Sequence, residues 1–250
     1  MTTMSNSALV AVTVPSPNHS GPRTHSIDRI TPHCVVGQCT AENLGSWFAN
    51  PSRQASSNYG IGKDGRVGLY VDEGNRSWCS SSTANDQRAV TIECASDKKA
   101  PFAMNWSVYN TLIELCADIC RRNGKKKLLW IDNKDQALMY TPAADEMLLT
   151  VHCWFAKKDC PGSWLMSRLG ELARTVTEQL NPAPVEQHDP APVKNGQFAD
   201  VQEGTWYADA VKRVSEKGLM NGYGDGRFGP NDPVTRAQLA VVLDKLTKGE

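Results

Sequence analysis

The sequence predicts an α/β fold in which a mixed central β-sheet is flanked by helices, followed by a smaller helical unit. Over the first two thirds of the 250 residues, short apolar segments typical of strands alternate with amphipathic helices. This alternation stops at residue 181, where a stretch rich in proline begins. We therefore expect a large domain over residues 1–180, an extended linker over 181–195 and a second unit over 196–250.

The strands are expected where β-branched and apolar residues lie between turn residues. Pro32 indicates an edge strand or the end of a strand, because proline cannot donate to a sheet ladder. The Lys63-Asp64-Gly65 turn predicts a hairpin between the strands on either side of it. The expected strands are 8–14, 30–36, 58–62, 66–71, 89–95 and 128–131.

Three helices are expected in the first domain. The first covers residues 41–49 and is closed by Asn50-Pro51. The second begins after Asn105 as N-cap and stops at Gly124; Cys116 and Cys120 fall on its apolar face, which indicates core positions. The third is capped by Ser163 and carries one apolar stripe, formed by Leu165, Leu169, Leu172, Val176 and Leu180.

The second unit is expected to contain two helices. Trp206 begins an apolar stripe that continues through Ala210, Val211 and Val214 and ends at Gly218. Thr235 and Gln238 have the spacing of a capping box at the start of the other helix. The apolar residues of that helix are Leu239, Val242, Leu243 and Leu246.

Composition limits the classes of partner. The chain has 27 basic and 27 acidic residues, so charge gives no argument for binding nucleic acid or an acidic membrane surface. No apolar run approaches the roughly 18 residues that span a bilayer. The first basic residue is Arg23, so we expect no secretory signal and synthesis in the cytoplasm. In such a chain the 8 cysteines are expected to be thiols, one of them a metal ligand.

His152 and Cys160 suggest a metal centre, because imidazole nitrogen and thiolate sulfur are ligands that zinc prefers. Of the other histidines, His33 is held on a predicted strand, so it is the candidate third ligand. Two histidines and one cysteine suit a catalytic zinc ion with one open position. The alternative for Cys160 is a core thiol.

Glu93 is an acidic residue within an otherwise apolar predicted strand. A buried carboxylate costs free energy unless it is paired or functional, which makes Glu93 a candidate catalytic base. The alternative is a glutamate at the end of the strand that faces water, and the pattern does not decide between them.

Four features follow one another along the chain: His33, the segment Asn58-Tyr-Gly-Ile-Gly-Lys-Asp-Gly65, the segment Val90-Thr-Ile-Glu93, and the segment from His152 to Lys158-Asp-Cys-Pro-Gly162. In this order they resemble the zinc-dependent N-acetylmuramoyl-L-alanine amidases of the type-2 family, which share a fold with peptidoglycan recognition proteins and the T7-type lysozyme. The resemblance covers about residues 8–180. It implies a Zn²⁺ ion held by His33, His152 and Cys160.

The resemblance also implies roles for other residues. Glu93 would be the general base, and Lys158 would stabilise the developing oxyanion. Asn58 and Trp78 are the expected substrate contacts. One branch of the family uses a tyrosine where this chain has Ser57, which leaves the base role to Glu93, and many relatives have Trp-His where this chain has Trp78-Cys79.

Residues 197–247 resemble one S-layer homology repeat, through Phe198-Ala-Asp-Val201, Trp206-Tyr-Ala-Asp-Ala210, Gly222-Tyr-Gly-Asp-Gly226 and Val234-Thr-Arg-Ala237. Such repeats bind secondary cell-wall polymers of Gram-positive bacteria. The resemblance implies that Trp206 and Arg236 contact this glycan, although the apolar stripe favours a core position for Trp206. Related proteins usually carry three repeats and this chain has one, so either three chains associate through this unit or a single repeat binds weakly.

The expected function is hydrolysis of the amide between N-acetylmuramic acid and L-alanine of peptidoglycan, as in a phage endolysin that reaches the wall after release from the cytoplasm. One alternative is a non-catalytic, recognition-type protein that binds peptidoglycan; such proteins usually lack a zinc ligand, whereas all three candidates are present here. The other is a thiol peptidase with Cys153 or Cys79 as nucleophile, which a chelator would leave active.

Overall fold

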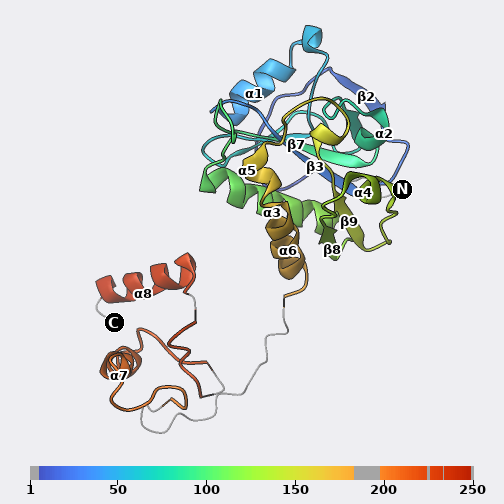
Figure 1. Ribbon diagram of the computed structural model, residues 1–250. Helices are drawn as coiled ribbons and strands as arrows, with labels where there is room; N and C mark the ends of the chain where they lie inside the picture. The colour runs from blue at the N-terminus through green and yellow to red at the C-terminus, as the bar shows by residue number, and fades with distance from the viewer. Residues whose placement is uncertain (1–5, 183–197, 224–225, 233, 249–250) are drawn as a thin grey trace. The chain divides into compact units, whose positions relative to one another are not determined.

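The computed structural model describes residues 6–182, 198–223, 226–232 and 234–248 (Figure 1). The chain forms two compact units, residues 1–183 and 184–250, which are considered separately. Apart from Asn181 and Pro182, the predicted linker lies outside the described residues. Among the helices that are described, none combines the length and the apolar character that crossing a bilayer requires.

The first unit is built on a seven-stranded sheet with the order β1-β5-β4-β7-β3-β9-β8. Neighbouring strands are parallel except for β4 and β5, so the sheet is mixed, as predicted. A separate antiparallel pair joins β2 (His19–Pro22) and β6 (Asn75–Ser77). The seven strands are β1 (Val10–Thr13), β3 (Arg29–Cys34), β4 (Tyr59–Ile61), β5 (Val67–Leu69), β7 (Ala89–Cys94), β8 (Lys127–Leu129) and β9 (Glu146–Leu149).

Helices cover both faces of this sheet (Figure 1). The main core lies between the sheet and α3 and α6, while α1 covers a smaller apolar cluster on the other face. This arrangement confirms the predicted fold class. The helices of the unit are α1 (Ala41–Phe48), α2 (Thr83–Asp86), α3 (Trp106–Arg122), α4 (Lys134–Met139), α5 (Ser163–Met166) and α6 (Leu169–Leu180), with single 3-10 turns at Pro51–Arg53 and His152–Trp154.

Several local predictions are confirmed. The Asn105 side chain accepts a hydrogen bond from Val108 N at 3.0 Å, and the chain leaves α3 at Gly124, whose φ is +67°. Cys116 and Cys120 are fully buried. The 8 cysteines, all of them among the described residues, form no disulfide. β4 and β5 form the predicted hairpin, with Gly65 at a φ of +83° in its turn.

The predicted final helix is wrong in one respect, because it is two helices. α5 ends at Met166 and α6 begins at Leu169, so the apolar stripe continues across a break. The prediction that Ser163 caps the helix is also wrong. Gly162 occupies the cap position, Ser163 is the first helical residue, and no side chain caps the helix.

Pro32 lies in a central strand, so of the two predicted alternatives, an edge strand or the end of a strand, the edge strand is wrong. β3 pairs with β7 over its whole length, but with β9 only at Arg29 and Ile30. Thr150 N donates to Ile30 O at 3.0 Å, and the next bond of this parallel ladder would need the N–H that Pro32 lacks. The proline thus ends the pairing with β9 just before His152. β9 itself was not predicted, although the run Met147-Leu-Leu-Thr-Val151 has strand composition.

The second unit contains α7 (Ala208–Glu216) and α8 (Arg236–Lys248). The capping box is confirmed: Thr235 N donates to Gln238 Oε1 at 2.8 Å and Gln238 N donates to Thr235 Oγ1 at 3.2 Å. Val211 is buried as expected, but Trp206 precedes α7 and is 94% exposed, so its core interpretation is wrong. The large apolar residues of α8 that are exposed are Leu239, Val241, Leu243 and Leu246.

Candidate metal centre and substrate groove

His33 lies near the end of β3, in the middle of the sheet. Its backbone is in register with that of Glu93 on the parallel strand β7, so both side chains leave the same face of the sheet side by side. The His33 side chain is fully buried. Burial, with a smaller contribution from nearby His152, holds the pKa of His33 well below its usual range. The imidazole is therefore neutral at pH 7, as a metal ligand must be.

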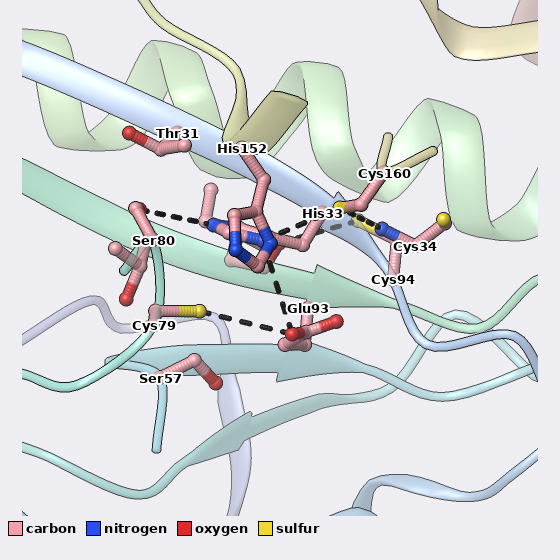
Figure 2. Close-up of polar contacts among 12 residues, drawn as sticks. Thr31, His33, Cys34, Ser57, Cys79, Ser80, Glu93, Cys94, His152 and Cys160 are labelled. Atoms are coloured by element: carbon pink, nitrogen blue, oxygen red, sulfur yellow. Dashed lines mark hydrogen bonds and ion pairs between the residues drawn. The ribbon is translucent and has the colours of Figure 1, made fainter. Parts of the chain in front are cut away.

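The structure brings His152 and Cys160 to His33. His152 starts the 3-10 turn after β9, and its ring centroid lies 5.0 Å from that of His33. Cys160 Sγ lies 3.3 Å from His33 Nδ1, although 127 residues separate the two in the chain. One donor atom from each of the three residues lies within 4.8 Å of the other two. Figure 2 shows His33 between Cys160, Ser80 and Glu93.

This donor set fits a zinc ion. Bonds of about 2.0–2.3 Å at tetrahedral angles would place the nitrogen and sulfur ligands about 3.6 Å apart, close to the observed separation of His33 and Cys160. The other nitrogen of each histidine is occupied: His33 Nε2 contacts Ser80 Oγ at 3.3 Å, and His152 Nε2 contacts Ser81 Oγ at 3.1 Å. Nδ1 of each ring therefore remains as the nitrogen for a metal.

Glu93 lies on one side of this centre. Its Oε1 is 4.0 Å from His33 Nδ1 and accepts a hydrogen bond from Cys79 Sγ at 3.7 Å. The side chain is 18% exposed, and Oε2 has no hydrogen-bond partner in the part of the chain that the structure describes. Burial raises the pKa of Glu93 to about 7. The carboxyl group can therefore both take up and release a proton near neutral pH. The alternative of a glutamate that faces water is not supported.

A groove of about 680 Å³ runs past Glu93 and His152. Trp78, a predicted substrate contact, lies in its wall and donates from Nε1 to Ser20 Oγ at 2.6 Å. Lys158 is exposed and contributes to the lining, which places a cation beside the predicted metal centre. Trp47 lines the same groove and is 43% exposed, with the Arg53 guanidinium 4.7 Å from its ring. Aromatic surfaces of this kind suit sugar rings and acyl groups.

The structure does not place Asn58 in the groove, which corrects the predicted substrate contact. Asn58 is fully buried. Its Nδ2 donates to the carbonyl oxygens of Val71, Asp72 and Asn75 at 3.1–3.3 Å. Its Oδ1 accepts from Thr91 N at 3.1 Å and Arg23 Nη2 at 3.0 Å. All its hydrogen-bonding capacity is used within the protein, so its role is structural.

The surroundings of the two thiols proposed for a thiol peptidase disfavour a nucleophilic role. Burial is the main cause that raises the pKa of both Cys79 and Cys153, which disfavours the nucleophilic thiolate. Cys79 contacts a carboxylate, Glu93, and not an imidazole.

The candidate ligand Cys160 also has a raised thiol pKa, because of its hydrogen bond with Cys34 and because of burial. A divalent cation would offset this effect by stabilising the thiolate.

The two residues predicted to bind cell-wall polymer belong to the second unit. The exposed Trp206 ring packs edge-on against Tyr207, with the centroids 5.5 Å apart. Arg236 begins α8, but its side chain lies outside the described residues. Their role in glycan binding stays a prediction.

Sequence reasoning missed Ser80, Ser81 and Trp47. The serines carry no chemistry of their own that would single them out, and their role follows from what they contact. Trp47 is on the predicted helix α1, where an aromatic residue next to Phe48 is typical of a core face. Its exposure is visible only in the structure.

In comparisons with known proteins, two parts of the chain match family models. Residues 23–163 match the family model described as N-acetylmuramoyl-L-alanine amidase. Residues 197–240 match the model described as S-layer homology domain.

Individual relatives match parts of the chain. N-acetylmuramoyl-L-alanine amidase A of Achromobacter lyticus is 38% identical over 82 residues, which are 32% of this chain and 44% of that protein. The cellulosome-anchoring protein of Acetivibrio thermocellus is 44% identical over 57 residues, 21% of this chain and 13% of that protein. The chain thus spans less than half the length of both. A solved structure of Staphylococcus aureus hydrolase AmiA with its ligand covers 71% of this chain and 92% of its own, at 12% identity and a TM-score of 0.47.

Proposed function

Because the chain belongs to the N-acetylmuramoyl-L-alanine amidase family, we propose that its first unit hydrolyses the amide between N-acetylmuramic acid and L-alanine of peptidoglycan with the help of a zinc ion. The observation that carries this proposal is the convergence of His33, His152 and Cys160 beside the half-buried carboxyl group of Glu93. These residues would hold the zinc ion and leave one position open. When bound, the ion supplies Lewis-acid polarisation and lowers the pKa of water.

The residues of this chain supply the proton transfer. The Glu93 carboxyl group, whose Oε1 lies 4.0 Å from His33 Nδ1, would take a proton from the attacking water. The same carboxyl group would then return this proton to the nitrogen of the leaving L-alanine. Lys158 lines the same groove, and its ammonium group would stabilise the negative charge that develops on the carbonyl oxygen.

The groove would hold the substrate on either side of the bond to be cut. Trp78 and Trp47 offer flat surfaces on which a sugar ring or the lactyl group packs. The Arg53 guanidinium beside Trp47 would attract a carboxylate of the stem peptide. Binding would thus position the amide between Glu93 and Lys158 and remove much of the entropic barrier.

The second unit contains an S-layer homology domain, for which we propose binding to a secondary cell-wall polymer. Attachment of this unit to the amidase domain would raise the local concentration of enzyme at its substrate. Together the two activities suit an endolysin that lyses Gram-positive walls. Its action would follow release of the protein from the cytoplasm.

Digestion of purified peptidoglycan, followed by mass spectrometry, tests the proposal. We expect free N-terminal L-alanine on the stem peptides and intact glycan strands, and we expect EDTA to abolish the reaction and Zn²⁺ to restore it. Cleavage that resists EDTA would contradict the metal-dependent mechanism and favour a thiol peptidase. Binding of peptidoglycan without any released product would instead favour a recognition-type protein.

A further inference from the structure

Three consecutive side chains after β6 contact three different groups of the predicted centre. Cys79 Sγ donates to Glu93 Oε1 at 3.7 Å. Ser80 Oγ lies 3.3 Å from His33 Nε2, and Ser81 Oγ lies 3.1 Å from His152 Nε2. Figure 2 shows the first two of these contacts, with Cys79 and Ser80 on the same side of the histidine pair. Because the three contacts come from one short segment, the position of that segment determines all three.

The segment is itself held in place by a buried carboxylate. Asp86 Oδ2 accepts hydrogen bonds from the backbone N–H groups of Cys79 and Ser80, each at 3.0 Å. Asp86 is 2% exposed. Hydrogen bonds from backbone N–H groups to a carboxylate are among the stronger ones in proteins. Asp86 therefore fixes the backbone from which the side chains of residues 79–81 project.

Asn85 connects the same segment to the strands that carry the histidines. Its Nδ2 donates to Thr31 Oγ1 at 3.0 Å, and its Oδ1 accepts from Thr150 Oγ1 at 3.0 Å. The two threonine hydroxyls also contact each other at 2.7 Å. Thr31 and Thr150 precede His33 and His152 by two positions each, and all three network residues are almost completely buried. Asn85 thus couples the segment to the backbone positions of both imidazoles.

Ligand histidines bind a metal through one ring nitrogen, and the partner of the other nitrogen sets the tautomer and the direction of the ring. A serine hydroxyl that accepts from Nε2–H leaves the lone pair of Nδ1 for the metal. Ser80 and Ser81 stand in this position for His33 and His152. A buried network of this kind is costly unless every group is satisfied, and a satisfied network is rigid.

We propose that residues 79–86 are a positioning element for the metal centre, in which Ser80 and Ser81 select the metal-binding tautomer of His33 and His152. This inference rests on the proposed function, since it concerns the affinity of the same centre for a divalent cation. The proposed role of Ser80 and Ser81 acts through His33 and His152, and it is separate from the part that residues of this element play in lining the groove. The inference predicts that residues 79–86 make a measurable contribution to metal affinity.

Ser81 allows positioning to be separated from structural support. Its φ is +56°, a left-handed conformation that favours glycine. Ser81→Gly therefore suits the backbone while it removes the hydroxyl next to His152. If Ser81 has a structural role, Ser81→Gly should lower the stability of the metal-free protein. If Ser81 positions His152, the variant should keep its stability and bind the metal more weakly.

The experiment uses the full chain, stripped of metal and titrated with Co²⁺ and Zn²⁺. Co²⁺ reports the centre through thiolate-to-cobalt absorption, and Zn²⁺ affinity follows by competition. We expect Ser80→Ala and Ser81→Gly each to weaken metal affinity about 10-fold, and the double variant up to about 100-fold. The control is Ser16→Ala, which removes another buried serine hydroxyl, the donor to Phe48 O at 2.7 Å. It should lower the melting temperature without a change in affinity.

Three results would overturn the inference. If the variants at 80 and 81 bind both ions as tightly as the wild type, while His33→Ala abolishes binding, the positioning role fails and the proposed function stands. If Ser16→Ala weakens binding as much as Ser80→Ala does, the effect is one of general stability. If the wild-type chain shows no thiolate-to-cobalt band, the proposed metal centre fails, and this inference fails with it.

Discussion

His33 and Glu93 are register partners on the parallel strands β3 and β7, and His33 Nδ1 lies 4.0 Å from Glu93 Oε1. Two strands in the middle of the sheet, and not two loops, therefore set the spacing between the first metal-ligand candidate and the candidate base. Groups held on rigid strands keep their separation when substrate binds. The predictions on catalysis start from this pair.

Glu93→Gln tests the base. The amide cannot accept a proton, so we expect hydrolysis of peptidoglycan to fall about 10²–10⁴-fold. The metal ligands stay in place, so the variant should bind Co²⁺ with the absorption of the wild type. Release of soluble fragments from insoluble peptidoglycan measures the rate, with Glu42→Gln, at an exposed glutamate paired with Arg66, as the control. Near-normal hydrolysis by Glu93→Gln would show that another group is the base.

Lys158→Met tests stabilisation of the oxyanion. Methionine keeps much of the side-chain length but removes the charge, so we expect kcat to fall about 10²-fold and KM to change little, since the charge acts mainly in the transition state. The neighbouring Lys157, which is also exposed, gives the matched control Lys157→Met. Equal losses in the two variants would indicate a general charge effect, and a change confined to KM would indicate substrate binding.

Glu73→Ala tests the buried ion pair at the other side of the sheet. The fully buried Glu73 accepts from Tyr59 OH at 2.7 Å and from Arg122 Nη1 at 2.9 Å. Its removal leaves buried polar groups without this acceptor, so we expect the free energy of unfolding to fall by about 3 kcal/mol in urea titrations. Glu178→Ala, at the exposed pair with Arg174, should change it by about 0.5 kcal/mol or less. Similar losses in both would contradict the assigned burial.

The burial of the Cys116 and Cys120 thiols predicts a loss of folding stability at alkaline pH. Burial raises the pKa of Cys120 to about 12 and that of Cys116 well above its usual value. In the unfolded chain these thiols ionise from about pH 8.5, so between pH 8.5 and 12 the unfolded state binds fewer protons and stability falls as pH rises. Their contribution is complete at pH 7 and about 2 kcal/mol smaller per thiol at pH 10.

Urea unfolding at pH 7, 8.5 and 10 measures this effect, with Cys120→Ala beside the wild type. Alanine creates a cavity at every pH, so the slope with pH is the quantity to compare. We expect the variant to lose about 2 kcal/mol less than the wild type between pH 7 and 10. Parallel curves for the two proteins would contradict the prediction.

Residue chemistry and spacing were enough to predict which donors could meet. The three metal-ligand candidates could be named because histidine and cysteine are few and have specific chemistry. The helix from Asn105 to Gly124 could be placed because its caps and its apolar spacing agree. The ligand roles themselves stay predictions, although the three side chains converge as the resemblance implied.

Other features could not be predicted, for physical reasons. Asn58 belongs to a motif of the family, but whether an amide faces substrate or the protein interior depends on neighbours far away in sequence, here Arg23 and Thr91. The strand β9 is short and begins with a charged residue, so its pattern is weak. Trp206 has the spacing of a helix stripe, yet the helix begins only at Ala208, and the indole remains exposed.

The long separation of His33 and Cys160 along the chain has a consequence for the time at which the protein can take up an ion. A growing polypeptide on the ribosome carries one imidazole early, but it lacks the second until residue 152 and the sulfur until residue 160 has been added. By then all seven strands of the sheet have been made. The proposed centre could therefore capture a zinc ion only late in biosynthesis, when the strands of the sheet have been made and α5 and α6 are still to follow.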